Sequence, residues 1–139
     1  MVLFSKTTTT KAMFSHRLPL LALFLLALLV PPLAEAERPP AVTAEIEYLL
    51  QKIASSGAKF VRDGTPYTPQ EAVAHMRKKL SAAGDRVKTA DDFVKGIATK
   101  SYLTGKPYYL LINGKQIPSG EWLTNALAER RATAAKKAE

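Results

Sequence analysis

The chain has 139 residues, of which 47% are hydrophobic and 23% charged, and 20 Lys and Arg against 12 Asp and Glu give a formal net charge of +8. This length and composition fit one folded domain and exclude a chain that is disordered throughout. The absence of cysteine excludes a disulfide framework, a thiolate metal site and a cysteine nucleophile.

The first segment, residues 1–36, has the pattern of a secretory signal peptide. Basic residues without any acid precede an uncharged run over 18–30, and the small residues of Ala34-Glu35-Ala36 follow. Cleavage is predicted after Ala36, which leaves 103 residues with a net charge of +6 and a periplasmic location. An uncleaved anchor in the inner membrane is the alternative, but a spanning helix needs about 20 apolar residues and this run is shorter.

Four helices are predicted after a lead-in over residues 37–43. Each is inferred from apolar residues that recur every three to four positions and from a residue that favours a helix start. The clearest start is Thr68-Pro69-Gln70-Glu71, because threonine and glutamate suit a capping box and proline suits the first helical position. The predicted helices cover about 44–56 with Thr43 as N-cap, 69–83, 90–98 and 119–130. A flexible basic tail is predicted over 131–139, with a frayed helix as the alternative.

Short strands are predicted between these helices, around two turn dipeptides. Asp63-Gly64 and Asn113-Gly114 both favour tight hairpins. Pro66 cannot donate a ladder hydrogen bond, so its strand fits only an edge. The predicted class is α+β, with four helices packed with a small antiparallel sheet that includes a hairpin in the C-terminal half. The strands cover 59–62, 65–67, 108–112 and 115–117, all within a single domain over 44–130.

Catalytic chemistry has one candidate pair, Glu71 and His75, which lie one helical turn apart. A carboxylate beside an imidazole can serve acid–base chemistry. The alternative is that Glu71 caps its helix and His75 is structural. The chain contains no phosphate-binding loop motif, no G-x-S-x-G elbow and no H-E-x-x-H motif. We therefore predict no metal site and no cofactor. A binding function is favoured over an enzymatic one.

Basic and aromatic side chains indicate binding of an anionic partner. The run Arg77-Lys78-Lys79 makes one predicted helix basic, and Tyr108 opens an aromatic strand. In the bacterial envelope, the partners of matching charge are lipopolysaccharide, phospholipid headgroups and anionic glycans, with another envelope protein as a further option. Nucleic acid is not expected for an exported protein. The alternatives are a basic face that serves solubility and a tyrosine that fills the core.

Several short motifs occur in a fixed order between residues 45 and 127. They are Phe60-Val61-Arg62-Asp63-Gly64, the pattern Glu71-Ala72-Val73-x-His75-Met76-Arg77-x-Lys79-Leu80, Thr89-Ala90-x-x-Phe93, and Thr104-Gly105-Lys106-Pro107-Tyr108. Together they resemble the YfeK-like family of small exported bacterial proteins, a domain of unknown function. The resemblance implies an envelope location in a Gram-negative bacterium and no particular reaction. The polar positions that it singles out are Arg62, Glu71, His75, Lys79 and Ser101.

The leading functional hypothesis is therefore an exported envelope protein with a non-enzymatic binding or accessory role. One alternative is a small periplasmic hydrolase or transferase that uses Glu71 and His75, and another is a structural, oligomeric envelope stress protein. Convergence of the polar positions in the fold favours a site, and dispersal counts against one. The candidate binding residues are Arg62, Lys79, Ser101 and Tyr108.

Overall fold

The computed structural model describes residues 38–139 of the chain. The predicted signal peptide and its cleavage point after Ala36 lie outside these residues. Among residues 38–139, no helix has both the length and the apolar character that crossing a membrane requires.

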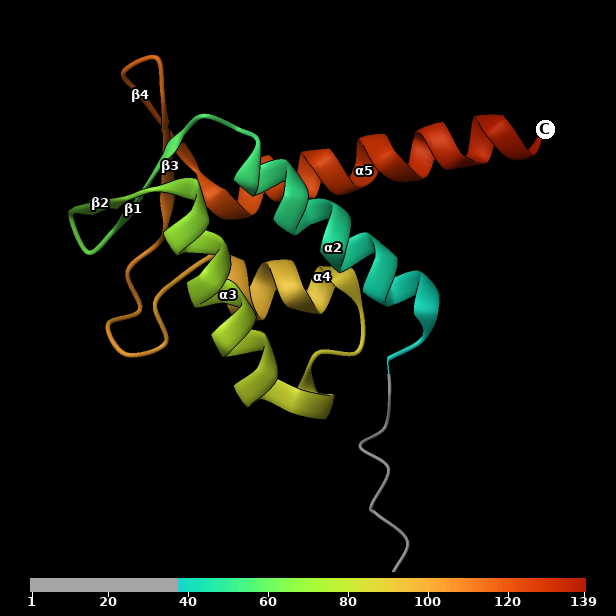
Figure 1. Cartoon of the computed structure of the whole chain (residues 1–139), viewed down its shortest axis with the longest axis horizontal. Helices are drawn as coiled ribbons and strands as arrows, with labels where there is room; N and C mark the ends of the chain where they lie inside the picture. The colour runs from blue at the N-terminus through green and yellow to red at the C-terminus, as the bar shows by residue number, and fades with distance from the viewer. Residues whose placement is uncertain (1–37) are drawn as a thin grey trace, which may run out of the picture. The chain divides into compact units, whose positions relative to one another are not determined.

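In this part of the chain, four helices and four strands confirm the predicted α+β class (Figure 1). The strands are short and occur in two hairpins, one after the first helix and one before the last. A 3-10 turn at Gly84–Arg86 follows the second helix, and a π-helical turn at Val94–Ala98 continues the third. The elements are α2 (Pro40–Ala54), β1 (Lys59–Arg62), β2 (Thr65–Tyr67), α3 (Pro69–Ala83), α4 (Ala90–Phe93), β3 (Tyr109–Ile112), β4 (Lys115–Pro118) and α5 (Ser119–Ala138).

The strands form one antiparallel sheet in the order β2-β1-β3-β4. Both predicted hairpins are confirmed, since Asp63 and Gly64 join β1 to β2 while Asn113 and Gly114 join β3 to β4. All four turn residues have positive φ, between 50° and 81°, which suits the twist of a two-residue hairpin. Strand β2 lies at one edge of the sheet, the position that Pro66 requires.

One face of the sheet packs against the helices. The strand register aligns Tyr67, Phe60, Leu110 and Ile117 across the four strands, and Phe60 and Leu110 are buried. Helix α2 is central to the helical layer, because it contacts α3, α4 and α5 (Figure 1). The apolar stripes predicted from helical periodicity supply most of the core. Its largest buried side chains are Leu49, Leu50, Ile53, Phe93, Leu110, Leu123 and Leu127.

The start of α2 differs from the prediction. The helix begins at Pro40, inside the expected lead-in over 37–43, and its N-cap is Pro39 rather than Thr43. Proline suits the first helical position because it lacks an N–H that would be left unpaired there. Arg38 anchors this end, since its guanidinium donates to the carbonyls of Gly84 and Val87 at 2.8 and 2.9 Å. The residues just before α2 therefore belong to the folded domain.

The C-terminal segment takes the helical form rather than the tail, because α5 continues beyond residue 130 as far as Ala138. Alanine and lysine, which dominate this stretch, are strong helix formers. Arg131 ties the helix to the domain, with both of its hydrogen bonds to the Glu45 carboxylate at 2.8 Å and a further contact to Asp91 at 3.0 Å. The ordered helix thus extends past the predicted boundary at residue 130.

Candidate functional site

The site begins at the N-terminus of α3, where the predicted capping box is formed. The Thr68 hydroxyl accepts from the Glu71 amide at 3.2 Å, and the Glu71 carboxylate accepts from the Thr68 amide at 2.8 Å and its hydroxyl at 2.9 Å. The hydrogen bond from the Thr68 backbone, followed by the one from its hydroxyl, lowers the pKa of Glu71. Glu71 is therefore an ionised capping residue whose carboxylate is already engaged.

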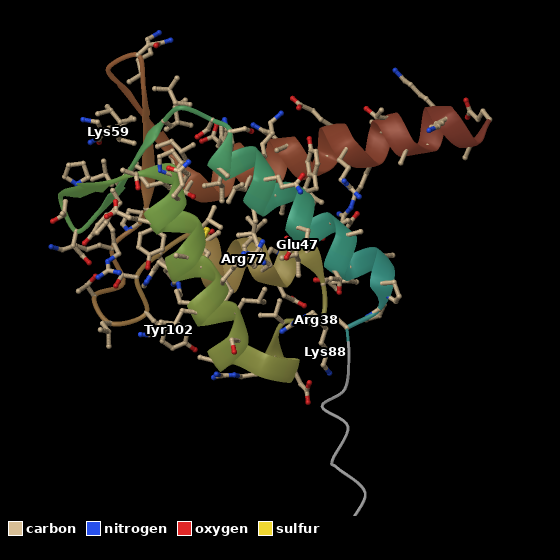
Figure 2. The ribbon with its side chains drawn as sticks, viewed as in Figure 1. Arg38, Glu47, Lys59, Arg77, Lys88 and Tyr102 are labelled. Carbon is tan, nitrogen blue, oxygen red and sulfur yellow. The ribbon has the colours of Figure 1, made fainter. Side chains whose placement is uncertain are left out.

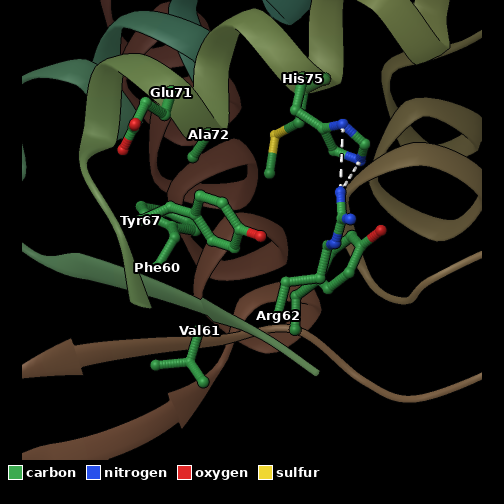
Figure 3. Close-up of a pocket in the computed structure, with 9 residues that line it drawn as sticks. Phe60, Val61, Arg62, Tyr67, Glu71, Ala72 and His75 are labelled. Carbon is green, nitrogen blue, oxygen red and sulfur yellow. Dashed lines mark hydrogen bonds between the residues drawn. The ribbon is translucent and has the colours of Figure 1, made fainter. Parts of the chain in front are cut away.

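A cavity of about 180 Å³ lies between α3 and the hairpin of β1 and β2 (Figure 3). Phe60 and Tyr67 form its sheet side, and Ala72 and Met76 form its helix side. Its remaining lining comes from Val61, Arg62, Glu71, His75 and Tyr108. An apolar cavity of about 150 Å³ admits a benzene ring, so this one has room for a single ring or a short branched chain.

Arg62 and His75 meet at one end of this cavity (Figure 3). The Nη1 atom of Arg62 lies 3.2 Å from Nε2 and 3.4 Å from Nδ1 of the imidazole. A neutral imidazole has one acceptor nitrogen, and only that nitrogen can accept the guanidinium N–H. An imidazolium has no acceptor, so a hydrogen bond from Arg62 can form only to neutral His75.

The environment of His75 holds it in the neutral form. Burial lowers the pKa of His75 first of all, and the positive charges of Arg62, Lys79 and Lys78 lower it further. The imidazole also meets Tyr108 edge to face, with ring centroids 6.5 Å apart and planes at 75°. At neutral pH the positive charge at this end of the cavity therefore resides on Arg62 and not on the histidine.

Arg62 itself is held between aromatic and acidic neighbours. Its guanidinium carbon lies 5.6 Å from the centroid of the Tyr67 ring, and Nε lies 3.8 Å from Asp63 Oδ2. The side chain is 38% exposed, and among the described residues Nη2 has no hydrogen-bond partner. Arg62 is thus oriented by its neighbours while part of its donor capacity faces solvent, as in a group that receives an anion.

Lys79, a predicted binding residue, contacts backbone carbonyls of the neighbouring helical segment. Its ammonium donates to the carbonyls of Ile97 at 2.5 Å and Lys100 at 3.2 Å, where the π-helical turn ends, and lies 5.1 Å from the Tyr108 ring centroid. Cations at helix C-termini satisfy carbonyls that have no partner within the helix. Burial lowers the pKa of Lys79, and the nearby Arg62 lowers it further. Lys79 therefore fastens α3 to the end of the α4 segment.

Ser101 and Tyr108 lie at the base of the loop between α4 and β3, and both are buried. The Ser101 hydroxyl accepts from the Thr104 amide at 3.4 Å. Burial raises the pKa of Tyr108, although Arg62 and Ser101 oppose the rise. Tyr108 lines the cavity, whereas Ser101 supports the loop behind it.

The polar positions singled out by sequence converge, but they do not form one reacting group. Arg62, His75 and Tyr108 meet at the cavity, and Lys79 and Ser101 support them from behind. Glu71 lines the cavity but is engaged by Thr68, and no described hydrogen bond joins it to His75. Figure 3 shows these two side chains leaving α3 in different directions.

Other basic residues of α3 are used elsewhere. Arg77 points to α2, where it holds the Glu47 carboxylate with two hydrogen bonds of 2.6 Å (Figure 2). Lys78 is exposed, but Arg77 is paired with Glu47 and Lys79 is directed to backbone carbonyls. The run 77–79 therefore does not present one continuous cationic surface. Within residues 38–139, no group of three or more histidine and carboxylate side chains is arranged to hold a metal ion.

Sequence reasoning missed Phe60, Tyr67 and Met76 as walls of a cavity. The signal was partly present, because a two-residue turn at 63–64 pairs Phe60 with Tyr67 and aligns both on the face that carries Arg62. The sequence pattern did not indicate that α3 lies over that face, because the position of α3 depends on packing between distant segments.

Comparison with known proteins agrees with the resemblance found in the sequence motifs. A family model described as "Family of unknown function (DUF5329)" matches residues 40–131. The chain is similar to "Uncharacterized protein YfeK" of Salmonella typhimurium (strain LT2), with 39% identity over 66 residues. That match covers 47% of this chain and 55% of the relative, so it spans about half the length of each. No solved structure matches the chain.

Proposed function

Because the chain belongs to the DUF5329 family of unknown function, whose description names no reaction, we propose its role from its own residues: an exported bacterial envelope protein that binds its ligand without transforming it. The ligand is an anionic envelope component, such as a lipopolysaccharide or an anionic glycan. An apolar group of ring size enters the cavity under α3, and its neighbouring carboxylate or phosphate pairs with Arg62.

The observation that carries this proposal is the combination of a small apolar cavity with one oriented arginine at its end. The cavity of about 180 Å³ is lined mainly by apolar and aromatic side chains, and Arg62 retains an unpaired Nη2 among the described residues. Binding sites for small groups commonly pair apolar walls with a few oriented polar atoms. A guanidinium that is partly desolvated favours planar anions over neutral groups.

Hydrolysis or group transfer through Glu71 and His75 has less support. General acid–base chemistry needs the two groups within hydrogen-bond reach of a common reacting atom. The Glu71 carboxylate accepts two hydrogen bonds from Thr68, and the His75 acceptor is directed to Arg62. Ligand binding at Arg62 and the cavity leaves Glu71 and His75 with their present partners, whereas catalysis requires both residues to leave those partners.

Export rests on the signal-peptide pattern of residues 1–36. Mass spectrometry of the protein recovered from the periplasmic fraction tests it. The proposal expects a chain that begins at Glu37. An intact N-terminus in the membrane fraction would instead support the anchored alternative.

Binding is tested by retention of the purified protein on immobilised lipopolysaccharide and on peptidoglycan. Two variants address the two halves of the site: Arg62→Gln removes the cation, and Ala72→Leu fills the cavity without changing charge. Lys59→Gln is the matched control, because Lys59 is an exposed cation on the same strand and alternates to the opposite face from Arg62.

We expect the retention of the wild-type protein to weaken as salt is added. Retention should fall about tenfold in Arg62→Gln, as for the loss of a charge-assisted pair, and it should also fall in Ala72→Leu. Lys59→Gln should be retained as well as the wild-type protein. Equal losses in Arg62→Gln and Lys59→Gln would reduce the interaction to general surface charge and overturn the proposal. So would the absence of retention at low salt.

A further inference from the structure

The loop over residues 100–107 carries the two most exposed large apolar side chains among residues 38–139. Tyr102 is 79% exposed and Leu103 is 97% exposed. Exposed lysines flank them, Lys100 on one side and Lys106 on the other. Tyr102 borders a hollow that Ala83, Val87 and Ile97 also line, whereas Leu103 is almost fully exposed. Two adjacent apolar side chains that face water indicate a contact surface.

The loop is held in this shape by hydrogen bonds at its base. The Ser101 amide donates to the Lys106 carbonyl and the Gly105 amide donates to the Ser101 carbonyl, both at 2.9 Å. Lys100 and Pro107 pair as an isolated antiparallel bridge below them. Positive φ of 69° at Gly105 permits the tight return. The base of the loop is thus closed by backbone hydrogen bonds, and Leu103 at the tip is left exposed.

Two contacts to other elements fix the loop against the domain. Thr104 donates through its hydroxyl to Asp63 Oδ1 at 2.8 Å, which joins the loop to the turn between β1 and β2. Lys79 donates to the Lys100 carbonyl at 3.2 Å, which joins it to α3. The apolar tip is thus presented by a braced support, and little conformational entropy is lost when it contacts a surface.

We propose that the loop over residues 100–107 is a membrane-contact loop, which inserts Tyr102 and Leu103 into the headgroup region of an anionic lipid surface while Lys100 and Lys106 pair with lipid phosphates. Tyrosine with an aliphatic neighbour is suited to this boundary, because the ring enters the apolar edge while its hydroxyl stays hydrated. Flanking lysines add attraction to anionic headgroups.

Charge and shape favour a lipid surface over a protein partner. A stable protein–protein interface buries about 1,200 Å² or more in total, whereas here two side chains project from a loop tip between like charges. A fluid surface of negative charge can conform to such a tip. Asp63 contacts the loop, but its carboxylate is engaged by Thr104 and lies 3.8 Å from Arg62. Asp92 lines the hollow beside Tyr102, together with the cations Lys79 and Arg86.

The test is sedimentation of the protein with vesicles of phosphatidylcholine, with and without phosphatidylglycerol, at low and high salt. Leu103→Ser tests the apolar contact, and Lys100→Gln and Lys106→Gln test the charges. Lys59→Gln is the control, because it removes one exposed charge from the other end of β1, far from Tyr102 in the view of Figure 2. Circular dichroism confirms folding, which these exposed positions leave intact.

We expect binding that requires phosphatidylglycerol, falls about tenfold in Leu103→Ser, about fivefold for each lysine variant, and stays the same in Lys59→Gln. A Leu103→Trp variant adds a second readout. Its fluorescence shifts to the blue with anionic vesicles if residue 103 enters the bilayer, and the wild-type protein, whose only tryptophan is Trp122, reports the background.

Three results would overturn the inference. Wild-type protein could fail to bind anionic vesicles at low salt. Leu103→Ser could bind as well as wild type, which would mean adsorption through overall positive charge. Leu103→Ser could abolish a specific protein complex in envelope extracts while no variant affects vesicle binding, which would assign the loop to a protein partner. None of these results bears on Arg62 and the cavity, so the ligand site is judged separately.

Discussion

Replacement of Lys79 by methionine distinguishes a structural ammonium from a ligand-binding one. Methionine keeps the unbranched apolar stem of the half-buried side chain and removes only the charge. The variant leaves the carbonyls of Ile97 and Lys100 without their donor, at the point where the π-helical turn ends. It also removes the cation that lies 5.1 Å from the Tyr108 ring centroid.

The expected cost is about 2 kcal/mol. A hydrogen bond to a charged group contributes about 1.5–3 kcal/mol, and this applies to the partly buried Ile97 carbonyl. The Lys100 carbonyl is exposed and regains water, so its loss adds little. A cation–π contact adds about 0.5–1 kcal/mol, and relief of the ammonium's desolvation offsets part of the total, in the direction shown by its lowered pKa.

The assay is urea unfolding at neutral pH, followed by circular dichroism. With a slope of about 1–2 kcal/mol per molar urea for a domain of this size, the midpoint should fall by about 1–2 M. Lys78→Met is the matched control, since Lys78 is the exposed neighbour on the same helix and surface replacements usually change stability by less than about 0.5 kcal/mol.

A Lys79→Met variant as stable as Lys78→Met would refute this reasoning. The ammonium would then be dispensable for joining α3 to α4. If the same variant also lost retention on lipopolysaccharide, Lys79 would return to the ligand site that the sequence analysis assigned to it.

Two further predictions concern packing and protonation. Gly120→Ala should destabilise the protein by about 1 kcal/mol in thermal unfolding, despite the better helix propensity of alanine, because the new Cβ would lie 2.5 Å from Thr99 Oγ1. Gly96→Ala has no atom within 4 Å of its new Cβ, so it should be neutral or stabilising in the same assay. Similar effects at both sites would contradict the predicted clash. Because burial and three nearby cations lower the pKa of His75 below its ordinary value of 6.5, the unfolded chain takes up the proton first, so stability should decline as pH falls from about 6.5. Urea midpoints at pH values on both sides of that point should show a smaller decline in His75→Gln, and an imidazole that titrates at or above 6.5 by NMR would show that these cations do not control it.

Local signals in the sequence determined most of the elements. Thr68 and Glu71 predicted the start of α3, and the dipeptides at 63–64 and 113–114 predicted both hairpins. These signals act over a few residues, through hydrogen bonds and backbone conformations that need no distant partner. Alternation along the strands likewise made Phe60 and Arg62 share a face, as it did Tyr108 and Leu110.

Helix ends were less predictable wherever distant groups hold them. Arg38 ties the start of α2 to Gly84 and Val87, and Arg131 ties α5 to Glu45. Neither contact has a sequence signal, because the partners lie more than forty positions apart. The start of α2, expected after Thr43 but observed at Pro40, is therefore where reasoning from local pattern alone was wrong. At the C-terminus the local pattern left a tail and a frayed helix open, and the structure is helical there.

The sequence by itself determined the class of fold, the family and the set of polar residues that are candidates for a functional site. Only the tertiary structure decided what each of them does. It directed Arg62 to His75 and a cavity, gave Glu71 to Thr68, and committed Lys79 to the carbonyls of a neighbouring helix end. The physical reason is that the role of a charged side chain depends on which partners compete for it, and those partners come together only when α3 packs across the sheet.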